Sequence, residues 1–285
     1  MEQRRIGDKE VSAIGLGGMP MSVRKKNDVE LGVRTIHRAL DEGITFIDTA
    51  DVYTPDDAPI GHNEDLIARA LASYGASADH VLVATKGGMT RNGRDWGVDG
   101  RPEAIRASCE ASLRRLGVSA IGLYQHHRPD PDVAYADTMG GLLSLLEDGL
   151  IVRAGISNAN VEQINIAHEI LGDGLVSVQN EFSPRFRSSK PELDLCADRG
   201  IAFLPWSPLG GMSEAAALGT NFSAFEEVAA EYDVSPQQVC LAWELATSPV
   251  VVPIPGASRP ESITDSAKAA SLKLEQTDLD KLDKT

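Results

Sequence analysis

The sequence is poor in cysteine, with three residues in 285: Cys109, Cys196 and Cys240. They lie far apart, no two form a CxxC pair, and an odd number of thiols cannot all pair within one chain. This spacing argues against a disulfide framework and against a thiolate metal site, and it favours a reducing compartment. We therefore expect a cytoplasmic protein.

Positive charge is also scarce, because 27 lysine and arginine residues face 42 aspartate and glutamate residues and leave a formal net charge of −15. Nucleic acids and anionic membranes are bound by basic surfaces, so this balance argues against both as partners. An anionic cofactor would need a locally basic pocket. Long apolar runs are missing as well, since none approaches the roughly 20 residues of a membrane-spanning helix. We expect a soluble protein.

What the chain does contain is a regular alternation of apolar runs and amphipathic segments. A hairpin is predicted around Gly7-Asp8, with strands over residues 4–6 and 10–12. Eight further strands are predicted from apolar runs at residues 13–16, 44–47, 81–85, 121–125, 151–156, 176–179, 201–204 and 250–253. The helices predicted between them begin at Asp28, Asn63, Pro102, Asp137, Asn160, Pro191 and Ser235.

Crossovers between parallel strands are right-handed, and eight such units in a chain of this length predict one α/β domain over residues 1–285, a (β/α)8 TIM barrel. A doubly wound sheet would instead carry a GxGxxG turn and an acid for a ribose, and no such acid precedes Asp48. Long loops predicted at residues 53–63, 87–100 and 207–221 are typical of substrate and cofactor walls. Trp96, in the second loop, is a candidate for the substrate wall.

Polar side chains follow three of the predicted strands. The motif ITFIDTADVY carries Asp48 and Tyr53, the strand VLVAT is followed by Lys86, and IGLYQHHRP carries His126 and His127. The carboxyl ends of parallel barrel strands meet at one mouth, where the chemistry of such enzymes is placed. An acid, a phenol, an ammonium and an imidazole gathered there predict a proton-donating site.

The phenol of Tyr53 is a candidate general acid, although a free phenol with a pKa near 10 is a weak acid at neutral pH. A cation in contact lowers such a pKa by about one to three units, and Lys86, held charged by Asp48, is placed to do so. An alternative role for Lys86 is that of a Schiff-base lysine in a barrel aldolase. Adjacent histidines on a strand diverge, and no third ligand follows by spacing, so no metal site is predicted.

Seven segments, in this order, resemble the motifs of the aldo-keto reductase superfamily: FIDTADVY, VATKGG, LYQHHRPD, GISNAN, VQNEFS, PWSPLGG and PIPGASRPE. The resemblance covers nearly the whole chain, from Ile14 to about Ser266. It implies a barrel whose floor is closed by the hairpin, and NADPH-dependent reduction of an aldehyde or ketone, with NADH as the alternative cofactor. The catalytic residues that it implies are Asp48, Tyr53, Lys86 and His127.

In the family pattern an apolar residue usually stands at position 126, so the resemblance assigns the catalytic role to His127. Gly122 replaces an aspartate that is common before the LY pair. The same fold also serves as a regulatory subunit that binds the cofactor and turns over poorly, and the fold alone does not decide between the two. Steroids, sugars, pyridoxal-like aldehydes and xenobiotic carbonyls all remain open as small-molecule substrates.

The resemblance also implies where the nicotinamide of the cofactor binds. Ser157, Asn158 and Gln179 match positions that hydrogen-bond the carboxamide. Trp206 matches an aromatic position that stacks on the nicotinamide ring.

The phosphates and the adenosine are implied to lie along the last two motifs. The loop over the pyrophosphate, where small residues allow close backbone approach, is matched by Ser207, Leu209 and Gly210. The grip on the adenosine phosphate is matched by Gly256, Ser258 and Arg259. Asp265 stands where a glutamate usually contacts adenine, while Ser262 and Ser266 replace a frequent arginine and a usual asparagine.

Overall fold

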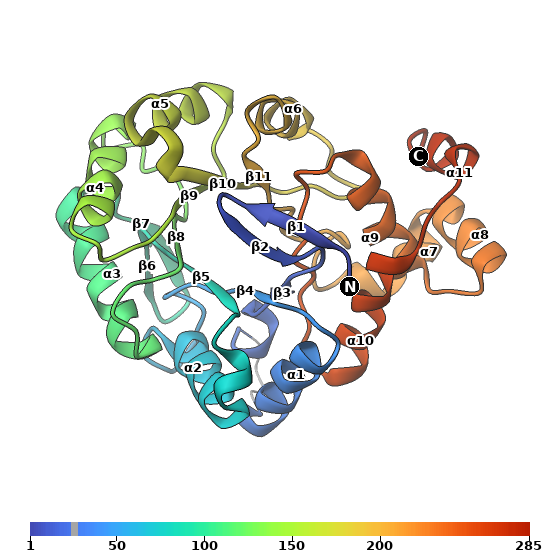
Figure 1. The fold of residues 1–285 in the computed structure, drawn as a ribbon, viewed down its shortest axis with the longest axis horizontal. Helices are drawn as coiled ribbons and strands as arrows, with labels where there is room; N and C mark the ends of the chain where they lie inside the picture. Colours follow the sequence, from blue (N-terminus) through green and yellow to red (C-terminus); the bar gives the residue numbers. More distant parts are fainter. Residues whose placement is uncertain (24–27) are drawn as a thin grey trace.

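A curled sheet of parallel strands forms the centre of the molecule. The structure is a computed structural model, and it describes residues 1–23 and 28–285. Neighbouring strands follow the order β3-β4-β5-β8-β9-β10-β11. Their bounds are Leu16–Gly17 (β3), Phe46–Asp48 (β4), Leu82–Gly87 (β5), Leu123–His126 (β8), Ala154–Ser157 (β9), Leu175–Gln179 (β10) and Ala202–Phe203 (β11). Figure 1 shows helices around these strands.

The eighth strand position of the barrel is filled by residues 251–256, which lie between the helices at residues 236–247 and 260–268 and close the sheet between β11 and β3. On one side the Val252 N–H donates to the Phe203 carbonyl at 2.9 Å, and on the other the Gly17 N–H donates to the Pro255 carbonyl at 3.0 Å. Pro253 and Pro255 have no N–H to donate, so the segment pairs through bridges and not as a regular ladder. The sheet and this segment together form the predicted (β/α)8 barrel.

Helices cover the outside of the barrel, with bounds Val29–Asp41 (α1), His62–Tyr74 (α2), Pro102–Leu116 (α3), Tyr135–Glu147 (α4), Val161–Leu171 (α5), Lys190–Arg199 (α6), Pro236–Thr247 (α9) and Pro260–Lys268 (α10). Local capping fixes several starts. The Asp28 carboxylate accepts a hydrogen bond from the Leu31 N–H at 3.0 Å at the start of α1. Asn160 and Gln163 form a capping box at the start of α5. Both starts confirm the sequence-based prediction.

The helix predicted to begin at Asn63 is present as α2, but it begins one residue earlier. The helix begins at His62, after Gly61 with φ of 102°. Asn63 is fully buried, where its amide nitrogen donates to the Gly18 carbonyl at 2.9 Å and its amide oxygen accepts from Thr49 Oγ1 at 2.6 Å. These long-range partners, which the local sequence does not reveal, give the side chain a different role and join the loops after β3 and β4.

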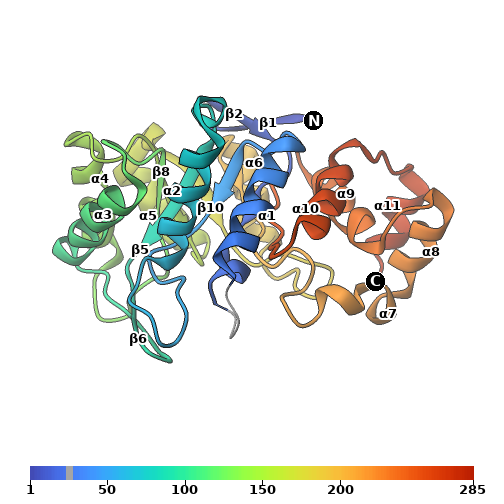
Figure 2. The same cartoon turned by 90° about the horizontal axis from the view of Figure 1, so that it is seen from below.

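The N-terminal hairpin closes one end of the barrel, as the family resemblance implies. It consists of antiparallel strands β1 (Gln3–Ile6) and β2 (Lys9–Ser12), with Gly7 at φ of 60° in the turn. Ile6 and Val11 are fully buried in the apolar cluster inside the barrel, together with Phe46 and Leu123. Figure 2 shows the hairpin at one end of the molecule and β6 at the opposite end.

Several elements lie where the sequence analysis predicts loops or makes no prediction. Residues 87–100 contain a second hairpin, formed by β6 (Met89–Asn92) and β7 (Asp95–Val98). The chain after β11 forms the short α7 (Leu218–Asn221), followed by α8 (Ser223–Tyr232), and α11 (Gln276–Leu282) lies near the C-terminus. No helix in the described parts of the chain is long and apolar enough to cross a membrane.

Candidate active site

A buried ion pair lies where β4 and β5 end. Asp48 and Lys86 are buried there, and Lys86 Nζ donates to Asp48 Oδ1 at 2.5 Å, to the Thr49 carbonyl at 2.8 Å and to the Tyr53 hydroxyl at 3.4 Å. All three donors of the ammonium are therefore in use. Burial acts to lower the pKa of Lys86, but the Asp48 charge and Tyr53 outweigh it and raise the pKa. Lys86 is a buried cation aimed at the phenol.

The second oxygen of Asp48 is held by two amides. Gln125 Nε2 and Gln179 Nε2 donate to Asp48 Oδ2 at 3.2 and 2.8 Å. Gln179 is predicted from the family resemblance to bind the cofactor, and Gln125 is not among the predicted site residues. The alternation of side chains along β8 offered a usable signal, because Gln125 and His127 are two residues apart and face the same side. The carboxylate is therefore oriented from three strands.

Tyr53 lies in the loop after β4, with 8% of its surface exposed. Burial raises the pKa of Tyr53, and the neighbouring Lys86 offsets this effect only in part. The net lowering expected from the cation alone was therefore wrong, because the loss of hydration of the phenolate outweighs the charge at 3.4 Å. The phenol is protonated at neutral pH and has a proton to donate.

The two histidines lie on different sides of the barrel wall. The His127 ring lies edge-on to the Tyr53 ring, with 5.7 Å between centroids, and lines the large cavity described below. His126 is fully buried against Tyr135, with 5.8 Å between ring centroids. Burial lowers the pKa of His127 well below its usual value, and the cation of Lys86 adds to this effect. His127 therefore faces Tyr53 as a neutral imidazole.

A cavity of about 1060 Å³ opens above these residues. Of the residues predicted to bind substrate or cofactor, those that line it are Trp96, Ser157, Asn158, Gln179, Trp206, Ser207, Leu209, Gly256, Ser258, Arg259 and Asp265. The two positions that depart from the family pattern, Ser262 and Ser266, line it as well. One cavity is thus lined by residues from six of the seven motifs, and Tyr53 is among these residues.

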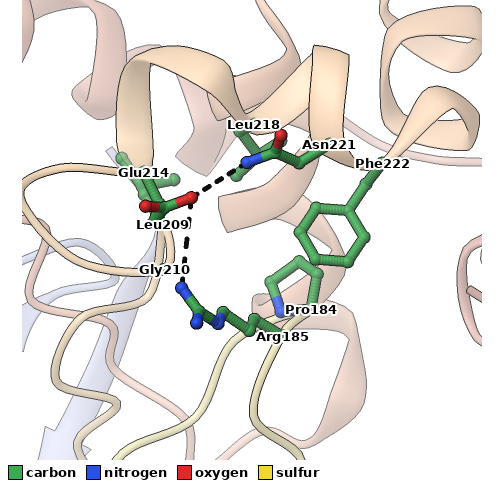
Figure 3. A pocket seen from close by; sticks show the side chains of 8 residues that line it. All are labelled: Pro184, Arg185, Leu209, Gly210, Glu214, Leu218, Asn221 and Phe222. Carbon is green, nitrogen blue, oxygen red and sulfur yellow. Dashed lines mark hydrogen bonds and ion pairs between the residues drawn. The ribbon is translucent and has the colours of Figure 1, made fainter.

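Gly210 is the predicted cofactor residue that does not line this cavity. It lies on a smaller cavity of about 330 Å³ on the loop after β11, together with Leu209, which lines both. Figure 3 shows this smaller cavity, where the Glu214 carboxylate accepts from Asn221 Nδ2 at 3.0 Å and lies 4.0 Å from Arg185 Nη1. The positive φ of Gly210, 83°, turns the loop at this point.

The residues predicted around the nicotinamide are linked to one another and to the catalytic group. Asn158 Nδ2 donates to the His127 carbonyl and to Ser157 Oγ, each at 3.0 Å, and Ser157 Oγ donates to the Gln179 carbonyl at 2.7 Å. Trp206 Nε1 is buried and has no hydrogen-bond partner among the described residues. A buried donor of this kind needs an acceptor, and a molecule in the cavity can supply one.

The residues predicted around the adenosine phosphate lie at the start of α10. Arg259 is the residue that precedes the helix, and its Nε donates to Ser262 Oγ at 3.0 Å. The serine that replaces the family arginine therefore orients the remaining guanidinium. Asp265 accepts from Ser235 Oγ at 2.7 Å and from Gln238 Nε2 at 2.6 Å, which ties α10 to α9.

Arg128 is a further cavity residue that the sequence analysis did not single out. It follows His127 directly, is exposed, and has no hydrogen bond or ion pair within residues 1–23 and 28–285. Its charge acts to lower the pKa of both Tyr53 and His127. With Arg259 it supplies the local positive charge that an anionic cofactor needs in an acidic protein.

Within the same described ranges, no three His, Cys, Asp or Glu side chains are grouped to hold a metal ion.

The chain is similar to known proteins in sequence and in fold. The model of the Aldo/keto reductase family matches residues 13–285. An uncharacterised oxidoreductase of Schizosaccharomyces pombe is 35% identical over 284 residues, which are 98% of this chain and 88% of that protein. A probable aldo-keto reductase of Glycine max is 33% identical over 95% of this chain and 84% of its own. The solved glycerol dehydrogenase of Gluconobacter oxydans has a TM-score of 0.84 and 29% identity, over 99% of this chain and 94% of its own.

Proposed function

The chain belongs to the aldo/keto reductase family, and we propose that it reduces an aldehyde or ketone with NADPH, with Tyr53 as the proton donor. The family and the named relatives support an oxidoreductase that acts on carbonyl compounds. The observation that carries the more specific proposal is the contact of Lys86 Nζ with both Asp48 and the Tyr53 hydroxyl. This hydroxyl belongs to a residue that lines the large cavity.

In this proposal, bound NADPH supplies the hydride to the carbonyl carbon. The Tyr53 O–H donates its proton to the carbonyl oxygen as negative charge develops there. The buried ammonium of Lys86 stabilises that charge and the phenolate that remains. The neutral imidazole of His127 lies edge-on to the Tyr53 ring and lines the same cavity, where a ring N–H can donate a second hydrogen bond to the carbonyl oxygen.

The cavity residues fit a nicotinamide dinucleotide. The amides of Asn158 and Gln179 lie at the catalytic end, and the unpartnered Trp206 Nε1 lies nearby in the same cavity. Arg259, held by Ser262, offers a guanidinium for the phosphate that distinguishes NADPH from NADH. We therefore propose NADPH as the preferred cofactor. The three cysteines are free and buried, in line with the cytoplasmic location proposed from composition.

The Schiff-base role of Lys86 is the weaker alternative. Such a lysine must lose its proton to attack a carbonyl, whereas the pKa of Lys86 is raised and its donors are all engaged. Borohydride added with a carbonyl substrate would trap a covalent adduct on Lys86 only in the aldolase case. We expect no added mass on the peptide that contains Lys86.

The direct test is a titration with NADPH and NADH followed by turnover on a panel of carbonyl compounds. Because one structural relative is a glycerol dehydrogenase, the oxidation of glycerol with NADP⁺ as the hydride acceptor should be measured as well. We expect saturable binding of NADPH, and NADPH oxidation that depends on the carbonyl compound. Tight binding without turnover across the panel would favour the regulatory-subunit role and count against the reductase.

A further inference from the structure

The guanidinium of Arg91, on β6, is buried and almost fully used as a donor. Its side chain is 1% exposed. Nη1 donates to the carbonyl of Val52 at 3.2 Å and to the carbonyl of Thr54, Nη2 donates to Asp56 Oδ1 at 2.7 Å, and Nε donates to the carbonyl of Gly93 at 3.0 Å. Four of the five N–H groups of the side chain are thus engaged.

The two carbonyl groups bound by Nη1 belong to the residues on either side of Tyr53. The loop that carries Tyr53 has no strand partner along residues 52–60, so its path depends on individual contacts. The Tyr53 N–H donates to the Ala50 carbonyl at 3.2 Å, and the Tyr53 carbonyl accepts from the Asn63 N–H at 3.1 Å. The carbonyl groups before and after this residue are both fixed by one side chain from another hairpin.

The same guanidinium also holds an aromatic wall of the cavity. Arg91 and Trp96 are opposite each other in the β6–β7 hairpin, and the guanidinium carbon lies 4.5 Å from the centroid of the indole. Cation–π contacts of this kind are attractive, most of all when the cation is desolvated. The indole is 43% exposed and lines the large cavity. Arg91 therefore touches both the loop of the proton donor and the proposed substrate wall.

We propose that Arg91 is a positioning residue, which fixes the Tyr53 hydroxyl and the Trp96 ring relative to the carbonyl group that is reduced. This inference rests on the proposed function of Tyr53. The hydroxyl is 3.4 Å from Lys86 Nζ, a distance at which a small shift of the loop ends the contact. Misplacement of a reacting group by about 1 Å can cost a factor of about 10² in rate.

Arg94 provides a matched control on the same hairpin. Its Nε donates to Asp56 Oδ2 at 3.0 Å, its side chain is 79% exposed, and no contact to a backbone carbonyl of the Tyr53 loop is present. Arg91→Met and Arg94→Met remove the same charge and break a contact with the same carboxylate. Only Arg91→Met removes the hydrogen bonds to the carbonyl groups on either side of Tyr53.

We expect kcat of Arg91→Met to fall by about tenfold to a hundredfold, while its Kd for NADPH stays within about twofold of the parent. The alkaline limb of the kcat profile should move to higher pH, because a phenol displaced from Lys86 loses the contact that lowers its pKa. KM for bulky aromatic carbonyl compounds should rise as Trp96 loses its support. Arg94→Met should match the parent in all four measurements.

Amide hydrogen exchange of the peptide that spans residues 49–61 tests the inference without turnover. Exchange should be faster in Arg91→Met than in Arg94→Met, with the rest of the barrel unchanged.

If Arg91→Met does not fold, Arg91→Lys takes its place. A single ammonium cannot span two carbonyl groups and a carboxylate as a planar guanidinium does, so the same changes are expected in smaller size.

Equal exchange at residues 49–61 in the Arg91 and Arg94 variants would overturn the inference, whether or not the parent reduces a carbonyl. The inference would also be overturned if exchange were faster in Arg91→Met while its kcat and the pH profile of kcat matched those of an active parent. A parent without carbonyl-dependent turnover would instead refute the proposed function, and the exchange measurement would still report on the Arg91 contacts.

Discussion

Replacing Lys86 with methionine removes the charge at the centre of the site while keeping an unbranched side chain. In the parent the ammonium has three acceptors and lies 2.5 Å from Asp48. In the variant the Asp48 carboxylate stays buried, and two glutamine amides on its other oxygen are the partners that remain. Stability and catalysis should both fall, for different reasons.

The loss of stability comes from the orphaned carboxylate. Breaking a buried ion pair by removing one partner costs about 3 to 5 kcal/mol. Because two amides still donate to Asp48, we expect a loss near the lower limit, about 3 kcal/mol in the free energy of unfolding. The loss of catalysis comes from the missing cation. One donor at a developing oxyanion is worth about 2.7 to 4 kcal/mol, so kcat/KM should fall by about 10² to 10³.

The double variant Asp48→Asn/Lys86→Met separates the two effects. It removes the orphaned charge, so urea unfolding should show most of the lost stability regained. Reduction of the best carbonyl substrate, followed by NADPH oxidation, should not recover. Binding of NADPH, titrated separately, should be within about twofold of the parent in both variants, because neither residue is proposed to hold the cofactor phosphates.

A double variant that regained both stability and turnover would refute the reasoning, because Lys86 would then contribute packing and not charge. The single variant gives an independent check. If Lys86→Met kept kcat/KM within about threefold of the parent, the cation could not be stabilising the reaction as proposed.

Three further predictions concern the cofactor, the histidines and a buried acid. Arg259→Met should raise the Kd for NADPH by about tenfold to a hundredfold and leave the Kd for NADH within about twofold of the parent. Equal losses of affinity for both cofactors would mean that Arg259 does not bind the phosphate that distinguishes NADPH from NADH. His127→Ala should lower kcat/KM by at least about tenfold, and His126→Ala should act mainly on the melting temperature; the reverse order would place the wrong ring at the cavity. Glu244 is fully buried with both carboxyl oxygens unpartnered among the described residues, and burial raises its pKa well above 4.5. The folded state therefore loses stability as pH rises above the pKa that Glu244 has in the unfolded state. In urea unfolding, Glu244→Gln should raise the free energy of unfolding by about 1 to 3 kcal/mol near pH 8 and by less near pH 5. Equal gains at both pH values would contradict this.

The barrel was predictable because its signals are local. Each predicted strand is a short apolar run, and the residues that follow two of them, Asp48 and Lys86, meet because neighbouring parallel strands end at the same edge. The closing segment was found from its apolar run, although Pro253 and Pro255 keep it from forming a regular ladder.

Contacts between distant loops were not predictable in the same way. Gly93 and Arg94 form the turn between β6 and β7, with Gly93 at φ of 61°, but the approach of Arg91 to the loop of Tyr53 is set by the packing of two loops. The net sign of the Tyr53 pKa shift depends on the depth of burial, and sequence shows the cation without showing that depth. Strand alternation puts Gln125 on the same side as His127, but its hydrogen bond to Asp48, 77 residues away in the sequence, could not be predicted from local signals.

The central claim, that Tyr53 donates the proton, is tested most directly by single-turnover reduction with Tyr53→Phe. The variant keeps the ring beside His127, at 5.7 Å between centroids, and removes only the hydroxyl. NADPH should bind with a Kd within about twofold of the parent, and the rate constant of the reduction step should fall by roughly 10² to 10⁴. A variant that reduced its best carbonyl substrate within about threefold of the parent, with chemistry limiting the rate, would contradict the mechanism.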